Sequence, residues 1–360
     1  MTYLINPNFL CRNLTGIERF AYETCKRLDL LLTPQDDVRI IIPQNAKNIP
    51  EYKNIKIIKS EKPLKSFPRW DLLEFGSWCK KLKATGINFS NTAPLGRRCG
   101  ISFIHDIYAK TYPQDFKSFK EKLIRAYSCF NYKNIARHAK KVLTVSEFSS
   151  KEIQKIYKVP GNRIQVIPNG WEHFNAVECE PLSDPDEFLA PGTYYFTLGS
   201  LQKRKNLGWI AKYAAAHPDE KFAVSGKAVS GFVSQDIAVL QKLPNVKLLG
   251  YVTDGQVKWL MKNCRAFVFP SYYEGFGIPP LEALSTGARI IVGKAASLPE
   301  IYKDSAVYID PYNTNCNLKE LLASSPECNQ NADVVLKEYT YDKAAQKLYN
   351  ILKQQYQEQT

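Results

Sequence analysis

Hydrophobic positions recur along the chain in short runs, and longer stretches with helical spacing follow several of them. Tyr3-Leu4-Ile5 precedes a helical pattern over residues 16–28, and residues 38–42 form a second apolar run. A third run, residues 101–104, precedes a long helical pattern with apolar positions three and four apart, at Phe116, Phe119, Leu123, Tyr127 and Phe130. Such alternation predicts an α/β protein with parallel sheets.

The pattern also predicts two domains. The chain has 360 residues, which is long enough for about two domains with cores of their own. Residues 178–192 lose the periodicity and gather proline and acidic residues, as a linker does, and the alternation restarts at residues 194–198. We therefore predict a first Rossmann-like domain over 1–177, a linker over 178–192 and a second Rossmann-like domain over 193–338.

Residues 266–292 carry the clearest chemical signal. They predict a strand, a loop with Gly275 and Gly277, a helix that begins with two prolines, and a second strand. The start of a helix suits an anion such as a diphosphate. Glu274 and Glu282 accept hydrogen bonds, so they suit hydroxyls on either side of it, a sugar and a ribose. The structural alternative is an acid stabilised by a helix N-terminus and an ordinary loop residue.

Other candidate residues follow predicted strands. Arg204 and Lys205 stand between a strand and a helix, where they suit a leaving diphosphate, although a solvated turn would be the better explanation if this segment stood alone. Gly16 lies between the first strand and first helix, and His105-Asp106 follows the run at 101–104. A structural histidine is the alternative at 105, and we interpret the other histidines, including His173, as structural.

Seven segments, taken in order, resemble the motifs of the family 4 glycosyltransferases, retaining enzymes of the GT-B fold. They are residues 15–19, 105–106, 144–149, 166–170, 199–206, 249–252 and 269–283. The resemblance implies two Rossmann-like domains that face each other across a cleft, with a C-terminal helix at about 339–360 that crosses back to the first, acceptor-side domain. The second domain would bind a nucleotide-sugar donor.

The resemblance also implies roles for individual residues. Glu274, with the amides of Gly275, Phe276 and Gly277, would contact the donor sugar, and Glu282 would hold the ribose. Arg204 and Lys205, next to Gly199 and Ser200, would hold the diphosphate, and His105 would face the sugar or its phosphate. Tyr251 and Val252 would lie beside the base, with Gly16, Arg19 and Asp106 in loops on the acceptor side.

The implied reaction transfers a hexose with retention, without a protein nucleophile, cofactor or metal. The D-x-D sequence at residues 184–186 lies in the expected linker, so we interpret it as accidental. The closest resemblance is to bacterial mannosyl- and rhamnosyltransferases of surface polysaccharides such as O-antigen or capsule. GDP-mannose is therefore the first expected donor, with dTDP-rhamnose or a UDP-hexose next. The alternatives are an epimerase- or phosphorylase-like enzyme of the same fold and a non-catalytic binding protein.

Charge and composition bear on partners and location. Of the net charge of +14, residues 1–180 carry +13, from 30 basic and 17 acidic residues. This asymmetry fits an anionic inner-leaflet membrane surface, where a polyisoprenyl-diphosphate-linked acceptor would lie, or a solvated basic face. We find no nucleic-acid-binding signature. The nine cysteines include no C-x-x-C pair, and no apolar run reaches about 18 residues. We expect a cytoplasmic protein, peripheral at the inner membrane face if its acceptor is lipid-linked.

Overall fold

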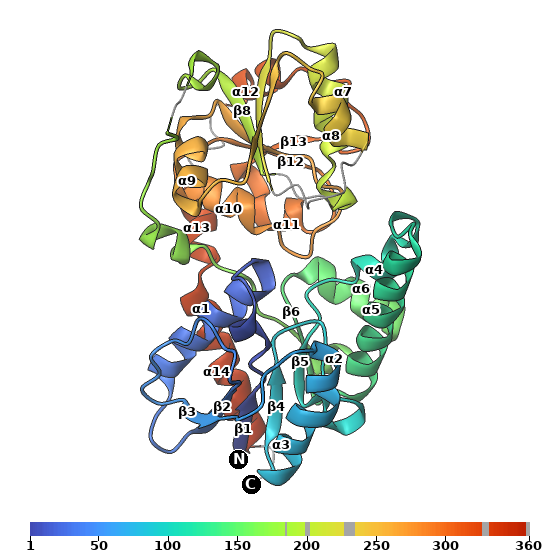
Figure 1. Ribbon diagram of the computed structural model, residues 1–360, viewed down its shortest axis with the longest axis vertical. Coiled ribbons are helices and arrows are strands. Elements are labelled where there is room, and N and C mark those ends of the chain that lie inside the picture. The colour runs from blue at the N-terminus through green and yellow to red at the C-terminus, as the bar shows by residue number, and fades with distance from the viewer. Residues whose placement is uncertain (184–185, 199–201, 227–234, 326–330, 358–360) are drawn as a thin grey trace. The chain divides into compact units, whose positions relative to one another are not determined.

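The computed structural model describes residues 1–183, 186–198, 202–226, 235–325 and 331–357, and it divides the chain into two units. The first comprises Met1–Gly170 and Tyr339–Thr360, and the second comprises Trp171–Glu338 (Figure 1). Each is an α/β unit around its own parallel sheet, as the alternation predicts.

The sheet of the first unit has seven parallel strands in the order β3-β2-β1-β4-β5-β6-β7. The order runs in opposite directions from β1 and from β4, so these neighbours form a topological switch point, the place where open α/β sheets bind ligands. The strands are β1 Thr2–Ile5, β2 Asp37–Ile42, β3 Lys56–Lys59, β4 Thr85–Asn88, β5 Ile101–Phe103, β6 Lys141–Thr144 and β7 Ile164–Val166.

The helices of the first unit cover the two faces of this sheet (Figure 1). Hydrophobic residues of α1 and of the strands form a core on one face, and the cluster around Trp70 and Phe75 forms another. The helices are α1 Gly16–Leu31, α2 Phe67–Arg69, α3 Gly76–Lys81, α4 Tyr108–Thr111, α5 Phe119–His138, α6 Glu147–Tyr157 and α14 Tyr341–Gln357.

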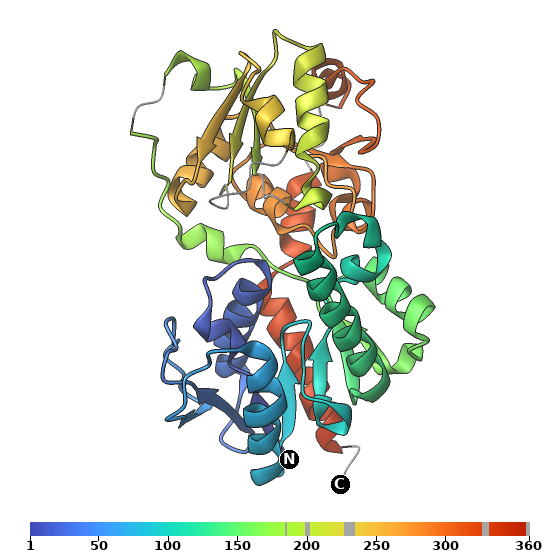
Figure 2. The same cartoon turned by 45° about the vertical axis from the view of Figure 1, so that its right-hand side comes forward.

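Helix α14 belongs to the first unit, as the resemblance led us to expect (Figure 2). Its residues Leu348 and Leu352 are buried in the core that α1 also lines. The Tyr3 hydroxyl of β1 donates to the Leu352 carbonyl oxygen at 2.7 Å, and Arg27 Nε of α1 lies 2.8 Å from Asp342 Oδ1. The chain therefore passes through the second unit and then returns to complete the first.

Helix α5 leaves exposed most of the apolar positions from which it was predicted, although Phe116, which precedes the helix, packs on a buried cluster. It begins after Ser118, which forms a capping box with Glu121. The buried positions lie in its C-terminal half, between Asn131 and Ala136. Phe119, Leu123 and Phe130 are instead 78%, 56% and 53% exposed. Because the same spacing describes any one-sided helix, it located this helix correctly but did not reveal which face packs on the protein.

The sheet of the second unit has six parallel strands in the order β10-β9-β8-β11-β12-β13, so its switch point lies between β8 and β11. The strands are β8 Tyr194–Leu198, β9 Lys221–Ser225, β10 Val246–Gly250, β11 Ala266–Phe269, β12 Ile290–Gly293 and β13 Val307–Ile309. The helices are α7 Leu207–Ala216, α8 Gln235–Leu240, α9 Asp254–Asn263, α10 Ile278–Ser285, α11 Leu298–Tyr302, α12 Leu318–Ala323 and α13 Ala332–Glu338.

The segment before β8 packs on the second unit, which starts at Trp171, earlier than the predicted first-domain end at residue 177. Trp171 Nε1 donates to the Leu336 carbonyl at 2.9 Å, and Lys258 Nζ of α9 donates to the Phe174 carbonyl at 2.8 Å. Further on, the Gly192 amide donates to the Asn263 carbonyl at 2.8 Å. Among the helices that the structure describes, none has both the length and the apolar composition to cross a membrane.

Candidate functional site

The candidate site of the second unit lies at the switch point of its sheet, where β8 and β11 end. Predicted residues Gly199 and Ser200 fall outside the described residues. The chain is next seen at Gln202, before a short helical turn, Lys203–Lys205. Asn206 then takes a left-handed conformation, with φ at +60°, and its side-chain amide donates to the carbonyls of Pro270 and Pro311 at 2.9 and 2.7 Å. These bonds fix the turn with Arg204 and Lys205 against the loop that follows β11.

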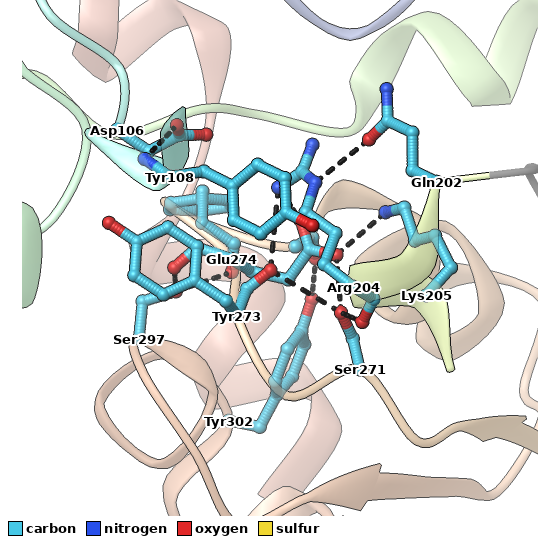
Figure 3. A network of polar contacts seen from close by, with 12 residues as sticks. Asp106, Tyr108, Gln202, Arg204, Lys205, Ser271, Tyr273, Glu274, Ser297 and Tyr302 are labelled. Atoms are coloured by element: carbon cyan, nitrogen blue, oxygen red, sulfur yellow. Dashed lines mark hydrogen bonds and ion pairs between the residues drawn. The ribbon is translucent and has the colours of Figure 1, made fainter. Parts of the chain in front are cut away.

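Glu274 joins the two predicted cations in one cluster (Figure 3). Arg204 Nη1 lies 3.0 Å from Glu274 Oε2, and Lys205 Nζ lies 2.7 Å from Glu274 Oε1. The Ser271 hydroxyl donates to Oε1 at 2.7 Å. Gln202 accepts from Arg204 Nε at 2.8 Å, which orients the guanidinium. The structure thus brings together three residues that the sequence placed on two segments.

This cluster carries a net positive charge. Glu274 is 4% exposed, and burial alone would raise the pKa of its carboxyl, but Arg204 and Lys205 outweigh burial and hold that pKa below its usual value. Glu274 is therefore ionised at neutral pH. Two cations and one carboxylate leave a net positive charge, which favours an added anion.

The loop over residues 275–277 leads from this cluster into α10. Gly277 has φ at +93°, a conformation that other residues rarely adopt, and a Cβ atom there would lie 2.6 Å from Leu298 Cδ2 and would displace that side chain. The Ser297 hydroxyl contacts the Glu274 carbonyl oxygen at 2.9 Å, and the buried Tyr302 hydroxyl donates to the Gly277 carbonyl. Ser297, which precedes α11, and Tyr302, the last residue of α11, therefore hold the predicted loop in place.

Helix α10 offers fewer amide donors than a typical helix N-terminus. Pro279 and Pro280 carry no N–H group, and the Leu281 backbone hydrogen-bonds to the Tyr302 hydroxyl. In its first turn this leaves the Ile278 amide to face an anion. The site therefore depends on side-chain cations more than the proline-containing sequence suggested.

Glu282 is the fifth residue of α10, and its partner is a histidine that sequence analysis treated as structural. His173 Nε2 lies 3.0 Å from Glu282 Oε1, and both side chains are largely buried. His173 belongs to the short helix Glu172–Ala176, which packs on α10. No local sequence signal marks His173, because its partner lies more than a hundred residues away.

The residues expected beside a base differ in exposure. Tyr251, directly after β10, is 69% exposed, whereas Val252 is buried at 8%. Of these two side chains, that of Tyr251 is therefore the more accessible to a ligand. Asp186, the described member of the D-x-D sequence, forms an ion pair with Lys247.

In the first unit, His105 is buried in an aromatic setting. Its Nε2 lies 2.6 Å from the Phe89 carbonyl oxygen, and its ring stacks on Phe103 with a centroid distance of 5.3 Å. Burial lowers the pKa of His105, so its imidazole is neutral at pH 7. Because a carbonyl only accepts, Nε2 carries the proton, and Nδ1 is an acceptor.

The other predicted residues of the first unit lie in its carboxyl-edge loops and at the start of α1. Asp106 Oδ1 accepts from the Tyr108 amide at 3.1 Å. Gly16, the first residue of α1, is exposed, and a Cβ atom there would meet no protein atom within 4 Å. Packing therefore does not require glycine at this position. Arg19, one turn further along α1, is half-buried.

Two family models match consecutive parts of the chain. Residues 14–173 match the model described as Glycosyltransferase Family 4, and residues 187–354 match the model described as Glycosyl transferases group 1. The two matches follow the division into units, except that the second continues into α14.

Curated relatives and a solved structure are similar to the chain over different lengths. It is 28% identical to O-antigen chain mannosyltransferase B of Escherichia coli, over 62% of this chain and 60% of the relative. It is 29% identical to O-antigen chain mannosyltransferase RfbU of Salmonella typhimurium, over 67% and 63%. These matches thus span less than two thirds of either relative. The structure of Anabaena Alr3699/HepE in complex with UDP-glucose has a TM-score of 0.64 at 15% identity, over 98% of this chain and 99% of that one.

Proposed function

Because this chain belongs to the family 4 glycosyltransferases of the GT-B fold, we propose that it transfers a hexose from a nucleotide sugar to a glycan acceptor. The observation that carries the proposal is the buried cluster of Arg204, Lys205 and Glu274 at the switch point of the second sheet. It offers positive charge for a diphosphate and a carboxylate for sugar hydroxyls in one place.

The chemistry follows from these charges. The bond between the anomeric carbon and the phosphate oxygen breaks, and its electron pair goes to the leaving diphosphate. Arg204 and Lys205 stabilise the negative charge that develops there. The acceptor hydroxyl attacks on the same face and gives its proton to the leaving phosphate oxygen, so the configuration is retained without a protein nucleophile. Glu282, held by His173, binds the ribose.

Donor and acceptor are proposed from the relatives. Both curated relatives are named O-antigen chain mannosyltransferases, which favours GDP-mannose, ahead of dTDP-rhamnose or a UDP-hexose. The similarity to a UDP-glucose complex supports a nucleotide sugar as the donor class. The acceptor would be a growing surface-polysaccharide glycan on a polyisoprenyl diphosphate. Since the cationic side chains of Arg204 and Lys205 would neutralise the charge of the diphosphate, we expect transfer to need no divalent ion.

The test begins with thermal-shift measurements on GDP, UDP and dTDP and their sugar conjugates, because a ligand of the native state raises its melting temperature. The donor that binds is then tested for transfer, with the anomeric configuration of the product assigned by NMR. A retained configuration and full activity in EDTA are expected. If a nucleotide sugar binds but is neither transferred nor hydrolysed, the chain is a binding protein. If the nucleotide sugar is converted into another nucleotide sugar, the chain is an epimerase. Inverted product, or activity that EDTA abolishes and manganese restores, would contradict the mechanism.

Helix α5 supports attachment to an anionic membrane surface. Phe119, Leu123, Tyr127 and Phe130 are all at least 36% exposed, and at about 100° per residue they span about 80° of the helix surface. We call them the α5 stripe. At the same helical spacing, exposed Lys120 borders one side of the stripe, and exposed Lys122 and Lys133 border the other. Apolar residues flanked by lysines are typical of a helix that lies in a membrane interface.

Vesicle sedimentation tests the attachment. Binding should rise with the phosphatidylglycerol content of phosphatidylcholine vesicles and fall with salt, since each basic residue near the surface contributes about 1 kcal/mol. Replacing Phe119, Leu123 and Phe130 by serine should remove binding. Leu30→Ser changes a leucine that is 66% exposed on α1 and should leave binding unchanged. If the triple serine variant and Leu30→Ser bind vesicles equally, or if the wild type does not bind at low salt, the α5 stripe is not a membrane-binding surface.

A further inference from the structure

Tyr302 has a buried hydroxyl that the proposed chemistry does not use. The side chain is fully buried, and Figure 3 shows it pointing into the polar network around Glu274. Its hydroxyl donates to the Gly277 carbonyl oxygen and hydrogen-bonds to the Leu281 backbone, both in the first turn of α10. Burial and the charges of Glu282 and Glu274 raise the pKa of Tyr302 well above its usual value, so the hydroxyl keeps the proton that it donates.

The carbonyl that Tyr302 contacts belongs to the peptide unit between Gly277 and Ile278. In a planar trans peptide, the C=O and N–H bonds point in opposite directions. The Ile278 N–H therefore points away from Tyr302 and from the buried side of the loop. It is the amide that the first turn of α10 offers to an anion, because the next two residues are prolines. A Cβ atom at Gly277 would lie 3.9 Å from Glu274 Cγ, so this peptide unit borders the charged cluster around Glu274.

The residues on either side of this peptide unit do not fix its orientation by themselves. Gly277 has φ at +93° and ψ at +67°, and a glycine leaves such a conformation more easily than other residues do. Ile278 precedes Pro279, and a residue before proline is biased away from the helical conformation that the first residue of α10 takes. A contact from outside the segment must therefore hold the peptide plane, and Tyr302 supplies one.

We infer that Tyr302 is a positioning residue for the donor, whose hydroxyl aims the Ile278 amide at the diphosphate. The inference rests on the proposed function, which supplies that diphosphate. Because the phenol donates to the carbonyl of the same peptide unit, it also polarises the unit and strengthens the N–H as a donor. No local pattern in the sequence marks this role, since Tyr302 lies 25 residues after Gly277.

The variant Tyr302→Phe tests the inference, because it keeps the buried ring and removes only the hydroxyl. Calorimetry measures its affinity for the nucleoside diphosphate that binds the wild type, and NMR titration measures the weaker binding of the nucleoside without phosphates. We expect the affinity for the nucleoside diphosphate to fall about fivefold or more, and the affinity for the nucleoside to stay within about twofold. A general disturbance of the unit would lower both affinities together. Tyr302→Met fills most of the same space without a donor and serves if the phenylalanine variant fails to fold.

A matched control and a measurement on the wild type complete the test. Tyr308→Phe also removes a hydroxyl that donates to a backbone carbonyl, that of Lys303 at 2.7 Å, and it should change neither affinity. The Ile278 amide is observed directly by NMR of protein with isotope-labelled isoleucine, and its signal is assigned by its loss in Ile278→Val. The signal should move when the nucleoside diphosphate is added and should stay in place when the nucleoside is added.

Several results would overturn the inference while the proposed function stands, because in each of them the wild type still binds the nucleoside diphosphate. They are an unchanged affinity of Tyr302→Phe for the nucleoside diphosphate, equal losses of both its affinities, an equal effect of Tyr308→Phe, and an Ile278 signal that the nucleoside diphosphate does not move. A wild type that binds neither nucleoside diphosphates nor their sugar conjugates contradicts the proposed function, and the inference falls with it.

Discussion

Replacing Glu274 by glutamine separates the two tasks assigned to its cluster. The substitution keeps the side-chain shape and removes one negative charge from a residue that is 4% exposed. Arg204 and Lys205, now 3.0 and 2.7 Å from the carboxylate, would lose their counter-charge. A nucleoside diphosphate should therefore bind more tightly, whereas transfer, which needs the carboxylate on the sugar, should slow.

Both changes have a calculable size. At an effective dielectric constant of about 20, a unit charge at about 6 Å contributes about 3 kcal/mol. Water and salt reduce this, so we expect a gain of about 1 kcal/mol, or about fivefold, in diphosphate affinity. A lost hydrogen bond to a charged group costs about 1.5–3 kcal/mol, which lowers kcat/KM for transfer by about ten- to a hundredfold.

The assays are calorimetric titration with the nucleoside diphosphate that binds the wild type, and kcat/KM with its sugar conjugate. Glu320→Gln, an exposed acid on α12 of the same unit, should change neither quantity. If a folded Glu274→Gln binds the diphosphate more weakly and loses transfer in the same proportion, Glu274 merely positions the cations. Its assignment to sugar hydroxyls would then be refuted.

Three further predictions concern other residues. His173→Phe removes the partner of Glu282. Calorimetry should therefore show that the preference for a ribonucleoside diphosphate over its 2′,3′-dideoxy analogue falls by about 1 kcal/mol, or about fivefold. An unchanged preference would contradict the role of Glu282 in binding the ribose. Burial lowers the pKa of His105 below 6.5, so its stabilising contribution is complete above pH 6.5 and is lost as the pH falls through the folded-state pKa. From pH 7 to 5 the Tm of the wild type should therefore fall more steeply than that of His105→Gln, and parallel curves would disprove this. Gly277→Ala meets both a φ of +93° and Leu298 at 2.6 Å, so urea unfolding should show a loss of at least about 1 kcal/mol, and a loss under about 0.5 kcal/mol would show that the loop relaxes.

Local chemistry was predictable from the sequence where consecutive residues determine it. The strand, loop and helix around Gly277 follow from glycine and proline positions, and β11, α10 and β12 lie where the pattern placed them. The contact between Glu274 and Lys205 was not predictable, because it depends on β8 and β11 being neighbours in the sheet.

Burial was less predictable than secondary structure. The apolar spacing of α5 is the same whether those residues pack on a core or face solvent, so the sequence predicted the helix but not that Phe119 is exposed. The sequence placed Val252 beside the base of a donor, and it did not reveal that this side chain is buried. His173 was dismissed for want of a neighbouring signal, although its partner Glu282 lies on a helix that the sequence did predict.

The return of the chain through α14 has a consequence for the order in which the protein folds. The second unit is one continuous stretch, so it can form as soon as its last residues leave the ribosome. The first unit must wait for Tyr341 and Leu348, which fill a core whose other wall, Phe20 and Leu28 of α1, was synthesised some three hundred residues earlier. Until then that wall is exposed to solvent. During synthesis the first unit is therefore the aggregation-prone half, and it gains its full stability only when α14 has been made.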